Sequence, residues 1–470
     1  MMKKPLLTGL AWLMLLPTFA QSDYSTFYQG LPKAMPMVQA PVIPANKVNL
    51  KDFGAVGDGL AMNTEAFRKA ISALDKQGGG HLIVPAGIWL TGLISLKDNI
   101  DLHLERNALI VMSPDKRDLI KTTDGKLEAK ASPAITASKR KNVSITGQGI
   151  IDGNGEYWRP VKRSKMSDAE WNQYLSMGGT VSEKGDLWYP FNLKHYPNVG
   201  ETARKQERMR AHLVRFTDCE NVLVQGVTLR NSPNFHLVPQ RCKNVIIDGI
   251  TVACPWNAQN GDAIDIGNCK DVLIVNNVIN AGDDGICMKG GIGENGRAAG
   301  PCENINIQDN TVYHAHGGFV IGSEFSGGMT NLYVHNNTFS GTDTGLRFKS
   351  AVGRGGVTKD IYISNIYMTD IKDEAIVFEC DYADKRAGST QQQGASPAKA
   401  DFSPEFTDIH ISDVICQGAE TGIKASGAKG MIYGIEIKNS TLFYTKKDKE
   451  IGADCDIKLD NVRFATFAQP

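Results

Sequence analysis

The sequence has no excess of charge of either sign, because 51 lysines and arginines balance 51 aspartates and glutamates over 470 residues. A general nucleic-acid binder or a membrane-surface binder would show a basic excess, so the balance argues against both classes. Charged residues make up 22% of the chain and apolar residues 41%. These values are close to the norm for soluble globular proteins and argue against a disordered chain.

Long apolar runs are scarce, and one that stands out lies near the N-terminus. Lys3 and Lys4 precede a mostly apolar run over 6–16, and a small residue, Ala20, follows. Such a run is too short to span a membrane and predicts a cleaved signal peptide over 1–20. We therefore expect export to the periplasm or the medium, with an N-terminal extension over 21–45.

The chain has nine cysteines, and the first of them is Cys219. An odd number leaves at least one thiol unpaired. No CxxC spacing and no group of cysteines and histidines indicates a metal, and we expect no cofactor. Several cysteines lie in apolar, strand-like runs, which favours buried free thiols over disulfides.

A short repeat is the dominant feature of the sequence from Lys141 onward. Each unit has Asn or Asp, then alternating β-branched residues, then a turn with Gly or Asn, and the period of two indicates strands. One unit cannot bury its own apolar face, so the units must stack. We expect an all-β, single-domain chain folded as a right-handed parallel β-helix. The units begin at Asn142, Asn221, Asn244, Asp271, Asn304, Asn331, Asp360 and Asp408.

The β-helix is expected to cover residues 46–470. Apolar residues at helical spacing after Asn63 predict a helix that covers the N-terminal end of the coil, with Asn63 or Thr64 as its cap. Two stretches interrupt the repeat, at about 154–212 and 383–404. Insertions in a solenoid usually gather at its binding face.

The first insertion is rich in aromatic and basic residues, and each group has two interpretations. The aromatic residues either stack on sugar rings or pack the insertion onto the coil. The basic residues either attract a polyanion or are balanced by the acidic residues among them. The basic residues are Arg159, Lys162, Arg163, Arg204, Lys205, Arg208 and Arg210.

Acidic and basic residues recur at intervals of about one coil. The four segments are Asn260-Gly-Asp262, Asp283-Asp284, Ala315-His316-Gly317 and Arg347-Phe-Lys349. Stacked strands lie about 4.8 Å apart, so carboxylates on successive coils can lie side by side. We expect the flanking glycines to form a turn that exposes both members of the Asp pair.

A cluster of carboxylates is what glycoside hydrolysis requires, with one group held as an acid and another ionised to activate water. Like charges at this range separate the pKa values of the groups. Arg347 and Lys349 occupy i and i+2 of a strand and therefore share a face, with Phe348 turned into the core. A guanidinium beside an ammonium suits the carboxylate of an acidic sugar.

With these four segments the chain resembles the polygalacturonase family, family 28 of the glycoside hydrolases, whose motifs are NTD, DD, GHG and RIK. The resemblance implies an inverting hydrolase of α-1,4-galacturonosyl linkages in pectic polysaccharide, without a metal. It implies that Asp283 is the general acid, that Asp262 and Asp284 activate water, and that His316 tunes the acid.

The resemblance also implies substrate-binding residues. Arg347 and Lys349 correspond to binders of the substrate carboxylate, and Tyr382 resembles a subsite tyrosine. Asn260 belongs to the same motif set, and His236 is a candidate to line the cleft, although a histidine in such a segment as often satisfies a turn.

The run from His316 to Glu324 is more similar to the exo-acting bacterial members of the family than to the endo enzymes. Gly261, Ala315 and Phe348 depart from the family motifs, so hydrolysis of rhamnogalacturonan or another pectin structure stays open. A Ca²⁺-dependent pectate lyase fits the pattern of His316 with Arg347 and Lys349 less well than a hydrolase does. A non-catalytic carbohydrate-binding solenoid would have no need to keep every reacting residue.

Overall fold

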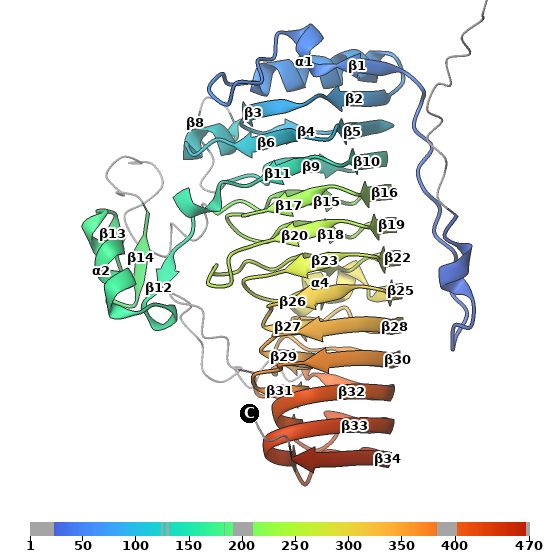
Figure 1. Ribbon diagram of the computed structural model, residues 1–470. Coiled ribbons are helices and arrows are strands. Elements are labelled where there is room, and N and C mark those ends of the chain that lie inside the picture. Colours follow the sequence, from blue (N-terminus) through green and yellow to red (C-terminus); the bar gives the residue numbers. More distant parts are fainter. Residues whose placement is uncertain are drawn as a thin grey trace, which may run out of the picture.

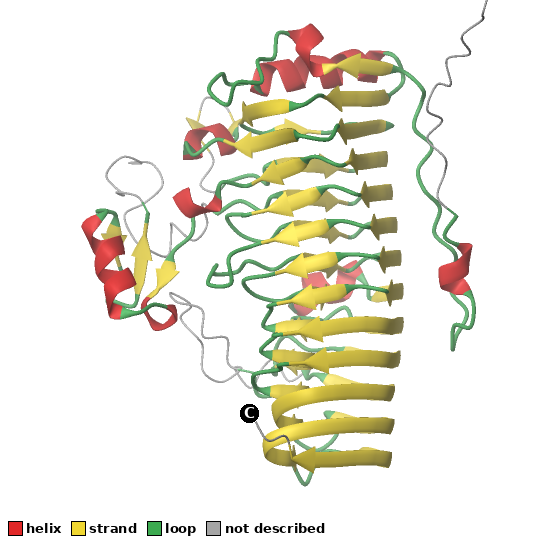
Figure 2. Ribbon diagram, in the orientation of Figure 1, coloured by secondary structure: helices red, strands yellow, loops and turns green. Residues whose placement is uncertain are grey.

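The structure is a computed structural model that describes residues 23–123, 126–127, 131–182, 184–190, 210–382 and 402–466. Successive coils stack along one axis, and each coil contributes strands to parallel ladders (Figures 1 and 2). The predicted parallel β-helix is therefore confirmed. The predicted signal peptide and most of the second insertion lie outside the described residues.

Three ladders of parallel strands run the length of the stack. The first ladder consists of β1 (Lys47–Asn49), β2 (Gly80–Val84), β5 (Ile100–Leu104), β10 (Lys141–Gly147), β16 (Glu220–Gln225), β19 (Lys243–Asp248), β22 (Lys270–Val275), β25 (Cys302–Gln308), β28 (Met329–Ser340), β30 (Val357–Thr369), β32 (Glu405–Ser426), β33 (Ile432–Ile451) and β34 (Ile457–Thr466).

The second ladder continues into the long strand β28 and consists of β3 (Gly87–Thr91), β6 (Ala108–Met112), β11 (Ile150–Asp152), β17 (Thr228–Arg230), β20 (Thr251–Ala253), β23 (Val278–Asn280) and β26 (Thr311–Tyr313). The third ladder continues into β32 and consists of β4 (Ile94–Ser95), β9 (Ile135–Ser138), β15 (Val214–Thr217), β18 (Leu237–Gln240), β21 (Ile264–Gly267), β24 (Ile286–Lys289), β27 (Gly317–Ser323), β29 (Thr344–Ser350) and β31 (Glu374–Glu379).

The residue that begins each predicted repeat has a left-handed backbone. All eight of these Asn and Asp residues have φ between 49° and 59°, a conformation that Asn and Asp tolerate better than other side chains. Their amides also form a ladder, since Asn221 donates to Asn142 at 2.8 Å and Asn244 donates to Asn221 at 2.9 Å. The repeat is therefore the sequence signature of a turn that every coil reuses.

Aligned apolar side chains fill the inside of the coil. In the first ladder, Val222, Val245, Val272 and Ile305 occupy equivalent positions on successive coils and are fully buried. Burial of such a side chain contributes about 1.5–3 kcal/mol. All nine cysteines are free thiols and eight are buried, as the sequence predicted.

Helix α1 (Thr64–Lys76) lies at the N-terminal end of the stack (Figure 1). Its buried face consists of Ala66, Phe67, Ala70, Ile71 and Leu74. The predicted side-chain cap is wrong. The Asn63 amide instead exchanges hydrogen bonds with Val56 and donates to the carbonyl oxygens of Ala61 and Leu90.

The N-terminal extension runs along the outer face of the first ladder (Figure 1). It contains the short 3₁₀ helix η1 (Ser25–Tyr28). Tyr24 and Val38 cover a small apolar cluster that includes Ile246 and Leu273. Lys33 forms an ion pair with Asp360 at 2.7 Å. The extension is thus bound to several coils at once.

The first insertion forms a small unit beside the coil (Figure 1). Its apolar packing comes from Trp158, Trp171, Trp188 and Tyr189, which are buried, so these aromatic rings pack the insertion. Its described elements are η4 (Gly155–Tyr157), β12 (Val161–Lys162), η5 (Arg163–Lys165), α2 (Asp168–Ser176), β13 (Thr180–Val181) and β14 (Leu187–Tyr189).

Two arginines of the insertion anchor it to the coil. Arg159 donates to the Ser232 carbonyl at 2.6 Å, and Arg210 donates to the Gln259 carbonyl at 2.8 Å. Both are buried. For these two residues the polyanion interpretation is wrong, because their charges are used inside the protein.

The remaining elements are short. They are η2 (Leu50–Phe53), η3 (Lys116–Leu119), the antiparallel pair β7 (Thr122–Thr123) and β8 (Lys126–Leu127), and α4 (Gly293–Ala299). None of the helices in the described ranges is long and apolar enough to cross a membrane.

Candidate active site

The four predicted motifs meet on the third ladder. Asp262 precedes β21, Asp283 and Asp284 precede β24, His316 precedes β27, and Arg347 lies within β29. These strands are consecutive neighbours in the ladder. Side chains that are far apart in the sequence therefore lie on four adjacent coils.

Backbone hydrogen bonds fix the register of the acidic residues. The Ala263 amide donates to the Asp284 carbonyl at 3.0 Å, and the His316 amide donates to the Asp283 carbonyl at 2.8 Å. The pairing of β21 with β24 aligns residues 22 positions apart, from Ile264 with Ile286 onward, and continued outward it places Asp262 beside Asp284. Asp262 and Asp284 are therefore neighbours on successive coils, as expected.

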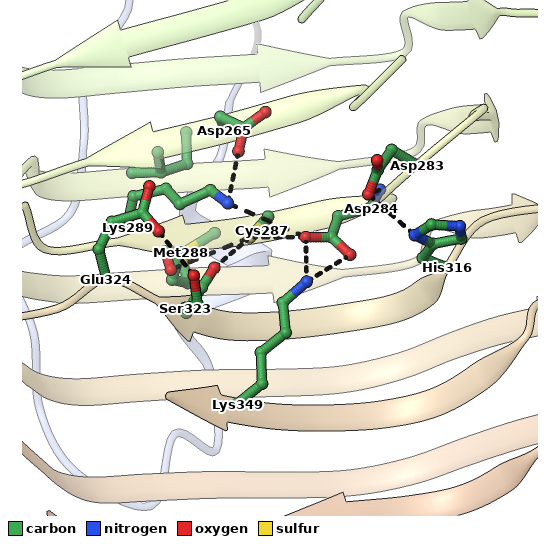
Figure 3. Close-up of polar contacts among 12 residues, drawn as sticks. Asp265, Asp283, Asp284, Cys287, Met288, Lys289, His316, Ser323, Glu324 and Lys349 are labelled. Carbon is green, nitrogen blue, oxygen red and sulfur yellow. Dashed lines mark hydrogen bonds and ion pairs between the residues drawn. The ribbon is translucent and has the colours of Figure 1, made fainter. Parts of the chain in front are cut away.

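Asp284 is the centre of the site (Figure 3). Lys349 donates to both of its carboxylate oxygens, at 3.0 and 2.8 Å. Burial opposes ionisation of Asp284, but Lys349, Lys289 and Arg347 outweigh it and lower its pKa. The expectation that both aspartates of the pair are exposed is wrong for Asp284, which is buried because Lys349 covers it.

Asp283 is the more accessible member of the pair, with its side chain 17% exposed. His316 Nδ1 lies 3.0 Å from Asp283 Oδ1, and His316 Nε2 lies 3.6 Å from Asp343 Oδ2. Burial opposes ionisation of Asp283, but the charge and hydrogen bond of His316, together with Lys349, lower its pKa. The histidine thus lies between two carboxylates and is closer to that of Asp283.

Asp262 is buried, and its Oδ1 has no hydrogen-bond partner among the described residues. Burial raises its pKa well above the usual range, and the charges of Asp265 and Asp283 add to the shift. Asp262 and Asp284 therefore have opposite ionisation preferences although they are neighbours on successive coils. Such a division between neighbouring carboxyl groups is a feature of catalytic sites.

His236 lies beneath Asp262 and does not line a cleft. Its ring is fully buried, and Nδ1 lies 2.9 Å from the Asp262 carbonyl oxygen. Because the Ser232 amide donates to Nε2, the proton of the ring is on Nδ1. Burial lowers the pKa of His236 to about 4. The prediction that His236 binds substrate is wrong, and the ring instead supports the turn that carries Asp262.

Asn260 also has a structural contact. Its side-chain oxygen accepts a hydrogen bond from Arg210 at 2.9 Å. The Asn260 backbone is left-handed, with φ of 53°. The amide oxygen is therefore bound to the end of the first insertion, and this contact ties the insertion to the turn before Asp262.

Lys289 and Asp265 form a second ionic group next to Asp284, and neither residue belongs to the four predicted motifs (Figure 3). Lys289 Nζ lies 3.6 Å from Asp265 Oδ1 and 3.9 Å from Asp284 Oδ2. Burial raises the pKa of Asp265 to about 7, although Lys289 opposes the shift. Strand alternation could have identified them in the sequence, because Asp265 in β21 and Lys289 in β24 point to the same side of the ladder as the site.

Arg347 and Lys349 share a face, as predicted, while Phe348 is buried in the core. The Tyr382 ring lies next to both cations, 5.6 Å from the Arg347 guanidinium carbon and 5.2 Å from Lys349 Nζ. Arg354 lies 5.8 Å from the same ring. The structure thus brings Tyr382 together with the basic residues. Lys349 differs from the expectation because it already binds Asp284.

One group of side chains in the described part of the chain has the spacing of a metal site. One ligand atom each of Asp283, Asp284 and His316 lies within 4.8 Å of the others. However, the Lys349 ammonium already binds both oxygens of Asp284. A divalent cation would have to displace it or bear its repulsion, so this group does not suit a metal ion.

A parallel β-helix with a cluster of carboxyl groups beside basic side chains has the groups that a glycoside hydrolase requires. The model of glycosyl hydrolases family 28 matches residues 172–453, more than half of the chain, and the chain belongs to this family.

Several known proteins are similar to the chain. An exo-poly-alpha-D-galacturonosidase of Dickeya chrysanthemi is 29% identical over 394 residues, which are 81% of this chain and 64% of that enzyme. The chain thus spans less than two thirds of that relative. A probable polygalacturonase of Vitis vinifera is 28% identical over 418 residues, which are 87% of this chain and 77% of that protein.

Solved structures agree with the fold. A hyperthermoactive exopolygalacturonase from Thermotoga maritima has a TM-score of 0.74 and 30% identity, and the match covers 91% of this chain and 94% of that one. A family 28 exopolygalacturonase of Yersinia enterocolitica has a TM-score of 0.64 and 22% identity, covering 91% of this chain and 79% of that one. The second likeness concerns the fold alone.

Proposed function

We propose that the protein is a polygalacturonase that hydrolyses α-1,4-galacturonosyl linkages of pectic polysaccharide. The observation that carries the proposal is the split carboxylate cluster of Asp262, Asp283 and Asp284 beside Arg347. The carboxyl groups supply the acid and the base of a glycosidase. The guanidinium suits the carboxylate of an acidic sugar. The names of the relatives from Dickeya chrysanthemi and Thermotoga maritima support this substrate.

In this proposal Asp283 gives a proton to the leaving oxygen, since it is the most exposed of the three carboxyl groups. His316 and Lys349 lower its pKa in the free protein. A bound uronate brings negative charge toward Arg347 and excludes water from the site. Both effects raise the pKa of a neighbouring carboxyl group, so substrate binding prepares Asp283 to hold a proton.

Asp262 and Asp284 then hold and activate the attacking water. They lie beside each other on successive coils, and Asp262 Oδ1 has no hydrogen-bond partner among the described residues. Water held on the face opposite the leaving group inverts the configuration of the sugar. Proton NMR of the first product then shows the β-anomer of galacturonate; the α-anomer as first product contradicts this step.

We further propose that the enzyme acts from chain ends. Support comes from the names of two similar proteins, an exo-poly-alpha-D-galacturonosidase and an exopolygalacturonase. The first insertion, which is anchored beside the site by Arg159 and Arg210, is the element suited to close one end of an otherwise open groove.

The function is tested by incubating the protein with polygalacturonate and, separately, with rhamnogalacturonan fragments. New reducing ends from polygalacturonate without an unsaturated, ultraviolet-absorbing product support a galacturonan hydrolase. If the protein cleaves rhamnogalacturonan but not polygalacturonate, its substrate is a different pectin structure. Activity should survive EDTA, since Lys349 occupies the anionic centre; strict Ca²⁺ dependence supports a lyase instead.

Asp283→Asn tests the catalytic assignment. The variant should fold and lose about 10²–10⁴-fold in kcat, because acid–base groups contribute this much. Asp343→Asn is the matched control, since Asp343 contacts the other nitrogen of His316. This variant should lose much less kcat than Asp283→Asn. Near-normal turnover by folded Asp283→Asn rules out the assigned role.

Export is a separate part of the proposal. The basic start at Lys3 and Lys4 and the apolar run over 6–16 support a signal peptide, and a pectic polymer lies outside the cell that degrades it. N-terminal sequencing of the protein recovered from the periplasm or the medium should begin near residue 21. Retention of the intact chain in the cytoplasm contradicts this part.

A further inference from the structure

A cavity of about 800 Å³ lies between the first insertion and the turns of the second ladder. Tyr174 and Trp188 line it from the insertion, and Trp256 and Ala258 line it from the turn after β20. Asn231, Asn257 and Asn280 add polar groups. The volume is in the range of small-ligand sites, about 300–1,000 Å³.

The wall of this cavity is also the back of the catalytic turns. A Cβ on Gly282 would lie 2.5 Å from the Ala258 carbonyl oxygen, and a Cβ on Gly261 would lie 2.8 Å from Cys254 Sγ. These two glycines directly precede Asp283 and Asp262. Their lack of a side chain lets the cavity wall pack against the turns, so the cavity adjoins the candidate active site.

Lys165 lies at the edge of the cavity, beside Trp256. It ends the helix η5, and its Nζ lies 6.0 Å from the centre of the Trp256 ring. It forms no hydrogen bond and no ion pair with the residues that the structure describes. Burial lowers its pKa, although the charges of Asp283 and Asp343 oppose the shift. A partly buried cation that lies beside Trp256, without a hydrogen bond or an ion pair to the described residues, is suited to receive an anion.

The other basic residues of the cavity have partners within the protein. Arg159 donates to Asn231 at 2.7 Å and to the Ser232 carbonyl. Arg230 forms an ion pair with Asp152 at 2.8 Å. Lys165, which lies beside the cavity residue Trp256, has no such partner among the described residues.

We propose that this cavity binds a uronate residue of the substrate chain, with Lys165 pairing with its carboxylate and Trp256 stacking on its ring. Trp256 is 57% exposed, and an exposed indole offers a flat apolar face to a sugar. The inference rests on the proposed function and deepens it, because it assigns substrate recognition to the insertion as well as to Arg347.

The test compares Lys165→Met with Lys184→Met, which removes an exposed lysine of the same insertion. Substrates are galacturonate oligomers of increasing length, each free or methyl-esterified. Lys165→Met should raise KM for the longer free oligomers about tenfold to a hundredfold, since a charge-assisted contact is lost. KM for the esterified oligomers should change little, so the preference for free acid narrows. Lys184→Met should behave as wild type.

Trp256 provides an independent readout. Trp256→Ala should raise KM for free and esterified oligomers alike, and Trp256→Phe should restore most of the affinity because an aromatic face remains. Melting temperatures of all four variants show whether the insertion is still packed. Two results would contradict the proposed site. One is a larger preference for free over esterified oligomers in Lys165→Met, and the other is an equal rise of KM in Lys165→Met and Lys184→Met.

Failure of this inference is distinguishable from failure of the proposed function. If the wild type cleaves no galacturonan, the proposed function is wrong. If the wild type cleaves galacturonan and folded Lys165→Met keeps the wild-type KM and ester preference, only the cavity site is wrong.

Discussion

Asp284 contacts one lysine directly and has a second within 4 Å, and these two lysines have different tasks. Lys349 binds both of its oxygens, whereas Lys289 lies between Asp284 and Asp265 at 3.9 and 3.6 Å. The first contact keeps Asp284 ionised. The second is shared with a carboxyl group whose pKa burial raises to about 7. The site therefore contains ionised and protonated carboxyl groups within two adjacent coils.

Asp265→Asn tests whether Asp265 is protonated in the folded protein, through the pH dependence of the free energy of unfolding. A carboxyl group with a raised pKa in the folded state contributes stability that is full below its unfolded pKa, about 3.9, and that is lost as pH rises through about 7. The free energy of unfolding of the wild type should therefore fall between pH 5 and pH 8. In Asp265→Asn the fall should be smaller, as measured by urea denaturation at both values.

Asp460→Asn serves as the control, because Asp460 is exposed on the last strand and should leave the pH dependence unchanged. An identical fall in wild type and Asp265→Asn would mean that Asp265 is ionised in the folded protein. Asp262 is present in every variant, but the charge of Asp265 contributes to its raised pKa, so the smaller fall in Asp265→Asn includes a contribution from Asp262.

Arg347→Gln tests recognition of the uronate at the main site. Loss of the guanidinium should lower kcat/KM on free galacturonan about tenfold to a hundredfold. Methyl-esterified galacturonan should be a poor substrate for the wild type. In Arg347→Gln the difference in kcat/KM between the free and the esterified polymer should be smaller. Initial rates on both polymers give the ratio of the two kcat/KM values. Equal rates of the wild type on esterified and free polymer contradict a carboxylate contact.

At the scale of an element, strand β29 holds the basic side chains of the site through the packing of Phe348. The Phe348 ring stacks on Phe378 with ring centres 4.3 Å apart and planes 7° apart, and it meets the edge of Phe319. Residues on either side of Phe348 face the site. The rigid core contact thus fixes the direction of Arg347 and Lys349.

Phe348→Ala should destabilise the protein by about 3–5 kcal/mol, the usual cost of removing a buried aromatic ring. Thermal or urea denaturation gives the change in stability. kcat/KM should also fall at temperatures where the variant stays folded, because Arg347 and Lys349 lose their support. Tyr367→Ala, at a 45% exposed ring on β30, should have little effect on either quantity. A cost below about 1 kcal/mol for Phe348→Ala contradicts the packing argument.

At the scale of the whole molecule, two segments outside the coil are attached to different sides of it (Figure 1). The N-terminal extension lies along the first ladder, where Tyr24 and Val38 cover apolar residues. The first insertion lies beside the second ladder and encloses the cavity next to the site. The coil thus supplies the proposed catalytic groups, and the insertion lines a cavity next to them.

Early products of a long galacturonan test the proposed chain-end action. A closed groove accepts only a terminal residue, so monomer should appear in the first minutes while viscosity changes little. Anion-exchange chromatography of samples at low conversion gives the product distribution. A ladder of intermediate oligomers with a rapid loss of viscosity would mean that the groove is open at both ends.

The repeat and the four motifs could be predicted from the sequence because each depends on local rules. Asn or Asp at the start of every unit gives the left-handed turn, and alternation gives strands that must stack. Once the coils stack, residues about one coil apart become neighbours, which brings Asp262 next to Asp284. The direction of Phe348 into the core followed from the same alternation.

Other features needed the tertiary structure, because they depend on which side chains meet across coils and across the insertion. His236 is a buried support rather than a cleft residue, since the Asp262 carbonyl and the Ser232 amide occupy its two nitrogens. Lys289 belongs to the site only because β24 lies beside β21. The sequence by itself determined the coil and the face that carries the four motifs; only the tertiary structure decided which charges are paired inside the protein, as with Lys349 and Asp284. Pairing is set by distances of a few ångströms between residues that are remote in the chain, and no local pattern encodes those distances.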